Sequence, residues 1–186
     1  MSKEKIAKRI RKLAKLEKSH CHQRRLEKEI KKAIKKKKGL NSNLITQALK
    51  CSPHFAGCFA KNEVKSLSFG SLPCFIIVNL DSSYMPGSHW IALGLFKNRV
   101  EIFDSLGFDL FNWPTVPCSL MNFLQQTAMS KRIRISKRIQ SNSSSLCGLY
   151  SVFYVKYRPY FSFKHLQSLF SSQLSRNDSM LLNLFF

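Results

Sequence analysis

Residues 87–96 read GSHWIALGLF, a short and mostly apolar run that opens with His89 and a tryptophan. The polar turn KNR at 97–99 separates it from a second run, VEIFDSLG, at 100–107. Two apolar segments of strand length joined by a short polar turn predict a β-hairpin. Antiparallel pairing would bring His89, at the start of the first strand, close to Asp104, near the end of the second. A carboxylate beside an imidazole fixes its tautomer and orientation, so the hairpin predicts a catalytic base and its orienting acid.

The candidate nucleophile, Cys147, follows a serine-rich loop in the sequence SNSSSLCGLY at residues 141–150. The apolar run 146–157 predicts a buried helix with the cysteine in its first turn, where the partial positive charge of the helix favours a thiolate. Gln140, seven residues before Cys147, is expected to donate to an oxyanion together with the Cys147 backbone N–H. Gly148 is expected to let a substrate backbone come close.

Each of these residues is ordinary on its own. A histidine before a tryptophan is usually structural, an aspartate after a strand often caps a turn, and a cysteine in an apolar helix is usually a small core residue. Their joint order along the chain is what predicts nucleophilic catalysis by a cysteine.

The formal net charge of +21 is concentrated at the N-terminus. Residues 1–38 hold 17 lysines and arginines against 4 glutamates, a net +13, which leaves 21 − 13 = +8 for the rest of the chain. We therefore expect a basic helical or disordered arm over residues 1–40 and a single domain over residues 41–186. Apolar arm residues recur at spacings of three and four, which indicates a helical face. A solvated, partly helical arm is the simpler interpretation.

A field of this sign attracts polyanions, of which nucleic acid is the commonest, and an anionic membrane surface is the weaker alternative. We predict sequence-independent binding of duplex DNA, because no base-reading module is evident. The segment 131–140 predicts a basic edge strand with Ile133, Ile135 and Ile139 on the side away from solvent. The predicted phosphate contacts are Lys35, Lys36, Lys37 and Lys38 of the arm, with Lys131, Arg132, Arg134, Lys137 and Arg138 of this strand.

The remaining periodicities predict a small set of further elements. These are a helix at 44–49 capped by Ser42 or Asn43, a strand after a turn near residue 53, a buried strand at 73–80, a helix at 119–129, and helical segments at 163–174 and 180–186.

The six cysteines show no regular framework, so we interpret them mostly as free thiols in a reducing compartment. A zinc site built from Cys51, His54, Cys58 and Cys74 is an alternative, but these spacings match no usual template and we predict no metal. No apolar segment resembles a secretory signal or is long enough to span a bilayer.

The order of these motifs resembles the adenain family, the adenovirus cysteine proteases, and its wider relatives, the SUMO-deconjugating proteases. The likeness rests on His-Trp at the start of one strand, Phe-Asp-Ser-Leu-Gly at the end of the next, and Gln140 followed by Cys-Gly seven residues on. It extends to residues 44–59, which resemble the start of adenain, and to 74–79, which resemble its central strand. It covers roughly residues 41–186.

The resemblance implies a papain-like or adenain-like α+β fold, with a mixed central sheet and the nucleophile at the start of a buried helix. It implies His89, Asp104 and Cys147 as the triad and Gln140 as the oxyanion donor. It further implies an endopeptidase that processes viral capsid or core precursors near DNA, in the host nucleus and the virion. We expect a monomer that needs no cofactor, binds no membrane, and is stimulated by DNA if it is stimulated at all.

Three features depart from adenain. The acid is Asp104, where adenain has glutamate and the SUMO proteases have aspartate. The basic arm has no adenain counterpart. No cysteine lies near Met129 and Ser130, where adenain bonds an activating peptide, and Cys118 lies too early for a match. Two alternatives stay open: a SUMO- or ubiquitin-like deconjugating protease, and a non-enzymatic basic DNA-binding virion protein.

Overall fold

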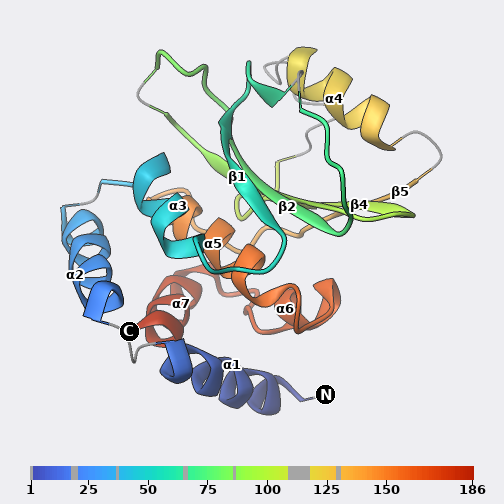
Figure 1. Ribbon diagram of the computed structural model, residues 1–186. Helices are drawn as coiled ribbons and strands as arrows, with labels where there is room; N and C mark the ends of the chain where they lie inside the picture. Colours follow the sequence, from blue (N-terminus) through green and yellow to red (C-terminus); the bar gives the residue numbers. More distant parts are fainter. Residues whose placement is uncertain are drawn as a thin grey trace.

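The computed structural model of the chain describes residues 2–17, 21–36, 38–64, 67–85, 87–108, 118–128 and 131–186. Within them a mixed sheet lies between one helix on one face and a larger group of helices on the other (Figure 1). The predicted α+β class is therefore confirmed. The predicted division at residue 40 into an arm and a domain stays a prediction.

The sheet has five strands in the order β1-β2-β3-β4-β5. They are β1 (Phe55–Ala60), β2 (Cys74–Asn79), β3 (Trp90–Leu95), β4 (Arg99–Phe103) and β5 (Arg132–Ile135). The outer pairs β1–β2 and β4–β5 are parallel, whereas β2–β3 and β3–β4 are antiparallel. The predicted hairpin is confirmed as β3–β4, and it lies near the middle of the sheet, where its strands are protected on both edges.

Alternating side chains of the inner strands feed two separate cores. In β2, Phe75 and Ile77 point to the core that contains helix α5 (Cys147–Tyr157). Their neighbours Ile76 and Val78 point to the opposite core, which α4 (Cys118–Ala128) covers. A strand buried on both faces needs a continuous apolar sequence, and this explains why residues 73–80 lack the alternation of a half-exposed strand.

Helix α5 runs through the middle of the helical layer (Figure 1). Ten of its residues, Cys147 among them, are buried. It contacts β3 and also α3 (Ser42–Leu49). Because α5 is apolar on every side, the sequence shows no amphipathic pattern there, which is typical of a helix enclosed by other elements. The nucleophile candidate therefore stands on one of the most enclosed elements of the molecule.

The N-terminal residues form two helices, α1 (Lys3–Glu17) and α2 (Cys21–Lys35). Four of their apolar residues are buried in the same core as α5: Ile6 and Ile10 completely, Leu26 and Ile30 almost completely. Helix α1 contacts α6 (Phe163–Ser168) and α7 (Asn177–Phe185), and α2 contacts α3. The prediction that this region is helical is therefore confirmed. The interpretation as a solvated arm is wrong, because the rest of the protein covers the apolar face of the helices.

Two local predictions need correction. Helix α3 is capped by Asn41, whose side-chain oxygen accepts from the Leu44 backbone N–H at 2.9 Å, and not by Ser42 or Asn43. Strand β5 is shorter than predicted, and its isoleucines are not shielded: Ile133 is 40% and Ile135 38% exposed. The strand lies at the edge of the sheet, and of the three isoleucines only Ile139, beyond the strand, is buried.

Short helical elements end the chain, in the order α6, a 3₁₀ turn at Leu174–Arg176, and α7. No described helix is long and apolar enough to cross a membrane. Within the described ranges, no three histidine, cysteine or acidic side chains gather as metal ligands, so the alternative zinc set is not assembled.

Candidate active site

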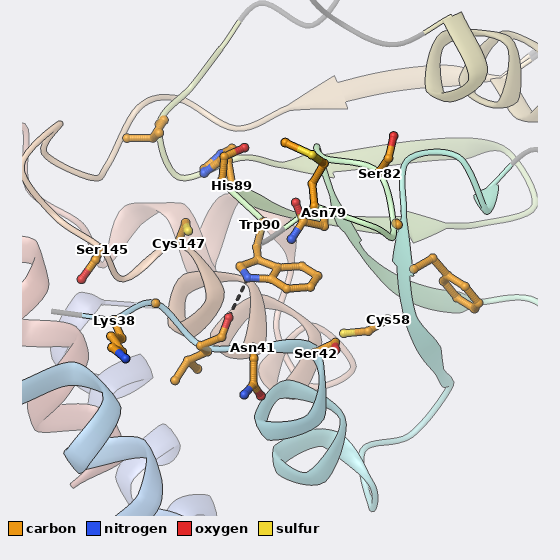
Figure 2. A pocket seen from close by; sticks show the side chains of 18 of the residues that line it. Lys38, Asn41, Ser42, Cys58, Asn79, Ser82, His89, Trp90, Ser145 and Cys147 are labelled. Carbon is orange, nitrogen blue, oxygen red and sulfur yellow. Dashed lines mark hydrogen bonds between the residues drawn. The ribbon is translucent and has the colours of Figure 1, made fainter. Parts of the chain in front are cut away.

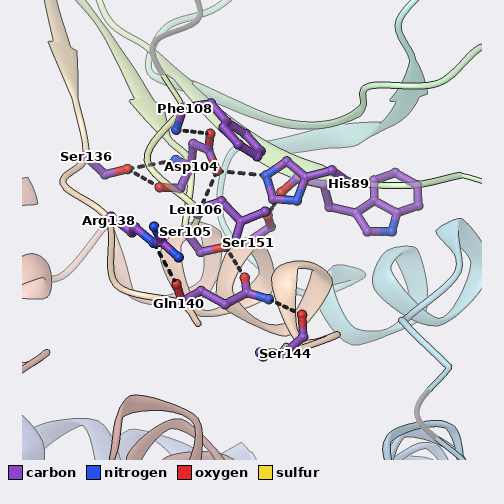
Figure 3. A network of polar contacts seen from close by, with 11 residues as sticks. His89, Asp104, Ser105, Leu106, Phe108, Ser136, Arg138, Gln140, Ser144 and Ser151 are labelled. Atoms are coloured by element: carbon purple, nitrogen blue, oxygen red, sulfur yellow. Dashed lines mark hydrogen bonds and ion pairs between the residues drawn. The ribbon is translucent and has the colours of Figure 1, made fainter. Parts of the chain in front are cut away.

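His89 and Asp104 meet at the end of the β3–β4 hairpin. His89 immediately precedes β3, and Asp104 immediately follows β4. His89 Nε2 lies 2.7 Å from Asp104 Oδ1, with the two side chains 7% and 0% exposed (Figure 3). The structure therefore brings the two residues together as the hairpin predicts, and a buried carboxylate orients the ring.

Backbone and hydroxyl groups hold the Asp104 carboxylate and its main chain in place. Oδ1 also accepts from the Leu106 backbone N–H, and Oδ2 accepts from that of Phe108, each at 2.9 Å. The Ser136 hydroxyl accepts from the Asp104 N–H at 2.8 Å and donates to the Asp104 carbonyl at 2.6 Å. A buried carboxylate with several hydrogen bonds stays oriented toward a single partner ring.

The turn after Asp104 requires a glycine. Gly107 has a φ of +66°, a conformation that side chains disfavour. A Cβ added there would lie 2.6 Å from the backbone nitrogen of Arg138. This close approach places the Ser105 carbonyl where it accepts from the backbone N–H groups of Ile139 and Gln140, at 2.9 and 2.8 Å. The turn thus joins the acid to the segment that leads to the nucleophile.

Cys147 completes the group from the opposite direction, at the start of α5. Burial of the His89 ring lowers its pKa, but hydrogen bonds to Asp104 and Cys147, together with their charges, outweigh burial and raise the pKa to about 9. His89 is therefore between a carboxylate on one side and a thiol on the other. An imidazole in this position can exchange a proton with the neighbouring thiol.

The raised pKa of His89 makes folding stability depend on pH. The folded value of about 9 exceeds the ordinary value of 6.5. The stabilisation is therefore complete below pH 6.5 and is lost as pH rises through about 9. We expect the urea midpoint of the wild type to fall over this interval more steeply than that of His89→Gln. Equal losses in both proteins would show that the His89 contacts do not contribute.

Gln140 lies beside the nucleophile loop with both ends of its amide engaged. Its Oε1 accepts from the Ser105 hydroxyl at 2.5 Å, and its Nε2 donates to the Ser144 carbonyl at 2.8 Å (Figure 3). The side chain is almost completely buried. One hydrogen on Nε2 serves Ser144, which leaves the second for another acceptor. The oxyanion role stays a prediction, and Gln140 also fixes the loop that ends at Cys147.

Sequence reasoning assigned Arg138 only to phosphate binding, but the structure places it against the nucleophile loop. Its guanidinium donates to the Gln140 carbonyl at 3.3 Å and to the Asn142 side-chain oxygen at 2.5 Å. The sequence Arg-Ile-Gln-Ser-Asn at residues 138–142 indicates this role, because an arginine four residues before an asparagine can donate to its side chain across a polar loop.

A cleft of about 920 Å³ opens over these residues (Figure 2). Its walls come from five parts of the chain: the segment 38–42, the end of β1, the loop between β2 and β3, the turn after β4 at Leu106, and the nucleophile loop. His89, Gln140 and Cys147 all line it. A cleft of this size, with polar groups converging on a thiol, has the properties of a ligand-binding or active site.

The structure corrects the role expected for Gly148 and adds a cleft wall that the sequence did not indicate. The space above Gly148 is filled, because a Cβ there would lie 3.0 Å from Leu40 Cβ and 3.3 Å from both Ile45 and Trp90. The glycine therefore permits close packing inside the protein and not the approach of a substrate. Sequence reasoning also missed the segment 38–42 as a wall of the cleft.

The predicted phosphate contacts are scattered. Lys35, Lys36 and Lys38 are exposed around the end of α2, whereas Lys37 lies outside the described residues. Arg132, Lys137 and Arg138 are exposed on and after β5. The guanidinium of Arg134 lies 3.9 Å from the buried carboxylate of Glu101, so part of its charge is already compensated. Met129, Ser130 and the Cys118 side chain, the positions compared with the peptide-bonding cysteine, also lie outside the described part of the chain.

Glu101 anchors the opposite end of α5. Its carboxylate accepts two hydrogen bonds from Arg158, at 2.6 and 3.0 Å, one from Arg99 at 2.9 Å, and one from Tyr154 at 2.9 Å. Burial alone would raise the pKa of this carboxyl, but hydrogen bonds from Arg158 and Arg99 reverse the shift and lower it. The network fixes β4, which leads to Asp104, against α5, which begins at Cys147.

This fold, together with a cysteine thiol next to a histidine that binds a carboxylate, is the arrangement of a cysteine peptidase. A family model described as adenovirus endoprotease matches residues 55–177. The match covers more than half of the chain, and the protein belongs to that family. No curated protein sequence matches the chain.

Solved structures of the pS273R protease of ASFV, African swine fever virus, are similar to the chain. One has 18% sequence identity and a TM-score of 0.54, and the match covers 80% of this chain and 67% of that one. A selenomethionine form has 23% identity and a TM-score of 0.41, with 61% and 43% covered. At these identities the likeness concerns the fold. The chain spans 43% to 67% of the length of these proteases.

Proposed function

We propose that the protein is a cysteine endopeptidase with Cys147 as nucleophile, His89 as proton carrier and Asp104 as the acid that orients it. The observation that carries the proposal is the position of His89 in an open cleft, between the Asp104 carboxylate at 2.7 Å and the Cys147 thiol. Family membership supports the same chemistry. No metal or organic cofactor is needed for it.

The reaction follows from this arrangement. The Cys147 thiolate attacks the carbonyl carbon of the scissile peptide bond and forms a tetrahedral oxyanion. The Cys147 backbone N–H, with Gln140 as the proposed second donor, stabilises that charge. The protonated His89 gives its proton to the departing amine as the C–N bond breaks. Neutral His89 then takes a proton from water, whose oxygen attacks the thioester carbon; the C–S bond breaks, and the acid and the Cys147 thiolate are released beside the protonated His89.

Labelling of Cys147 tests whether this site is reactive. A peptide probe carrying a thiol-reactive group should modify Cys147 faster than Cys51, which is exposed and lies outside the cleft. The His89→Ala variant should lose this preference, because its thiol no longer faces an imidazole. Equal labelling of both cysteines in the wild type would favour the non-enzymatic alternative.

We further propose that the substrates are virion precursor proteins of a DNA virus or a virus-like transposon, cleaved near duplex DNA. The support is the net charge of +21 and the exposure of those basic residues of α1 and α2 whose side chains the structure describes, on helices whose apolar faces are buried. Because duplex DNA is the proposed partner, we place the protein in the host nucleus and the virion. The deconjugase alternative lacks a feature that accounts for this charge.

Charge reversal on the N-terminal helices tests the DNA proposal. Lys8, Lys12, Lys28 and Lys32 are exposed, and their replacement by glutamate should spare the buried apolar face. We expect weaker DNA binding and a flatter dependence of log affinity on log salt, by about 0.9 for each phosphate that the protein no longer neutralises. Cleavage of a short neutral peptide should stay unchanged.

The matched control replaces Glu4 and Glu29, both exposed on the same helices, with glutamine. This variant should bind DNA at least as tightly as the wild type. Reversal is preferable to deletion of residues 1–38, because deletion would uncover the core that Ile6, Ile10 and Ile30 cover. If the reversed variant keeps the wild-type affinity and salt dependence, these helices do not contact DNA.

A further inference from the structure

Residues 38–42 form a segment, here called the strap, that joins the basic helix α2 to α3 and passes along the cleft. Its central residue, Leu40, is 4% exposed, and its carbonyl accepts from the Trp90 indole N–H at 2.8 Å (Figure 2). Trp90 lies immediately after His89 and is itself almost completely buried. This hydrogen bond therefore fixes the orientation of the residue next to the proton carrier.

The strap also contacts the nucleophile side of the cleft. A Cβ on Gly148 would lie only 3.0 Å from Leu40 Cβ, so Leu40 packs directly on the residue after Cys147. A Cβ on Gly39 would lie 3.5 Å from the Ser145 carbonyl oxygen, in the loop before Cys147. Leu40 thus touches two residues, Trp90 and Gly148, and each is the direct successor of a proposed catalytic residue.

A hydrogen bond and a close packing contact also join Trp90, at the start of β3, to the first turns of α5. The Ser151 hydroxyl, one turn along α5 from Cys147, donates to the Trp90 carbonyl at 3.2 Å. The Cβ position of Gly148 also lies 3.3 Å from the Trp90 ring. The start of β3 and the start of α5 therefore contact each other, and Leu40 of the strap contacts both.

We infer that Leu40 is a positioning residue, which sets the distance between His89 and Cys147 through Trp90 and Gly148. The inference rests on the proposed function of these two residues. Truncation of the Leu40 side chain leaves the backbone carbonyl that accepts from Trp90, but it opens a cavity over Gly148 that lets the start of α5 and the strap relax toward each other. Because proton transfer and nucleophilic attack depend steeply on geometry, a small relaxation there weakens the thiolate–imidazolium pair.

The test compares Leu40→Ala with Leu44→Ala. Leu44 is the same residue type, lies four residues later in α3 and packs on the same core, but its side chain is not among the nearest neighbours of Gly148. The readout is the rate of Cys147 alkylation by iodoacetamide as a function of pH, with melting temperature measured in parallel. This readout requires no substrate and reports the thiolate directly.

We expect Leu40→Ala to slow alkylation of Cys147 at neutral pH by about tenfold and to move the profile toward that of a free thiol. Leu44→Ala should lower the melting temperature while it keeps the wild-type profile. Leu40→Met, which conserves volume, should restore the rate. Trp90→Phe, which removes only the N–H donor and part of the ring, should change the profile in the same direction as Leu40→Ala.

Two results would overturn the inference. One is a wild-type alkylation profile in Leu40→Ala, whatever its melting temperature. The other is the same shift in Leu40→Ala and Leu44→Ala, because the effect would then be general destabilisation. Failure of the proposed function has a different signature: wild-type Cys147 would react no faster than Cys51 at any pH.

Discussion

Replacing Cys147 with alanine is expected to abolish peptide cleavage and to leave the fold intact. The side chain is small, buried and at the start of α5, so alanine fits without a clash. The reaction, in contrast, loses its only proposed nucleophile. In a nucleophile–base system such a loss lowers kcat by a factor on the order of 10⁶. The measurement is hydrolysis of a fluorogenic peptide, with circular dichroism to confirm folding.

Two other cysteines provide the controls for Cys147. Cys51 is exposed and outside the cleft, whereas Cys58 lines the cleft but lies beyond Trp90 from the nucleophile (Figure 2). Burial raises the pKa of the Cys58 thiol to about 12, despite a hydrogen bond to Thr46, so this group stays protonated and is a poor nucleophile. Alanine at either position should retain activity. Cleavage by Cys147→Ala at the wild-type rate would exclude the mechanism.

The hairpin and the order of His89, Asp104 and Cys147 could be predicted because they depend on local sequence. A polar turn between two apolar runs sets the strand pairing, and pairing alone brings His89 to Asp104. The buried helix that begins at Cys147 follows from a long apolar run after a serine-rich loop. Such patterns depend only on consecutive residues, so they can be recognised before any tertiary contact is known.

The strap and the N-terminal helices could not be predicted for the opposite reason. The hydrogen bond from Trp90 to Leu40 joins residues 50 positions apart, and no local pattern signals it. The apolar stripe of α1 predicts a helical face but not what covers it, and a highly charged sequence favours a solvated interpretation. The sequence around Gly148 likewise suggests access for a substrate, because sequence alone cannot tell which neighbour occupies the space a missing side chain leaves.

The prediction that the isoleucines of β5 face away from solvent is wrong because alternation indicates two faces but not their burial. Ile133 and Ile135 share a face at the sheet edge, where each side chain stays more than a third exposed. The alternating pattern is nevertheless real, since Arg132 and Arg134 occupy the other face. Burial of a strand face requires a covering helix, and α4 and α5 both lie over the inner strands instead.

The second large effect is expected at Gln140, where alanine should lower kcat by about 10²–10³ if the amide donates to the oxyanion. The structure adds a competing reason for such a loss, because the same side chain holds the Ser144 carbonyl and so shapes the nucleophile loop. Alkylation of Cys147 by iodoacetamide separates the two, because this reaction needs the nucleophile loop in place but forms no tetrahedral oxyanion. Ser105→Ala is the control, since it removes the hydroxyl that holds Oε1 at 2.5 Å but leaves both N–H groups of the amide and the Ser144 contact in place.

If Gln140 acts as an oxyanion donor, Ser105→Ala should lose much less than Gln140→Ala, and both variants should keep a KM close to the wild-type value. Gln140→Glu should behave like Gln140→Ala, because an ionised carboxylate of the same shape offers no donor and repels the developing charge. If Gln140→Ala slows alkylation of Cys147 as much as it lowers kcat, positioning of the loop explains the effect and the donor role is wrong. A wild-type rate in Gln140→Ala would remove Gln140 from the mechanism altogether and leave the Cys147 backbone N–H as the donor that the oxyanion depends on.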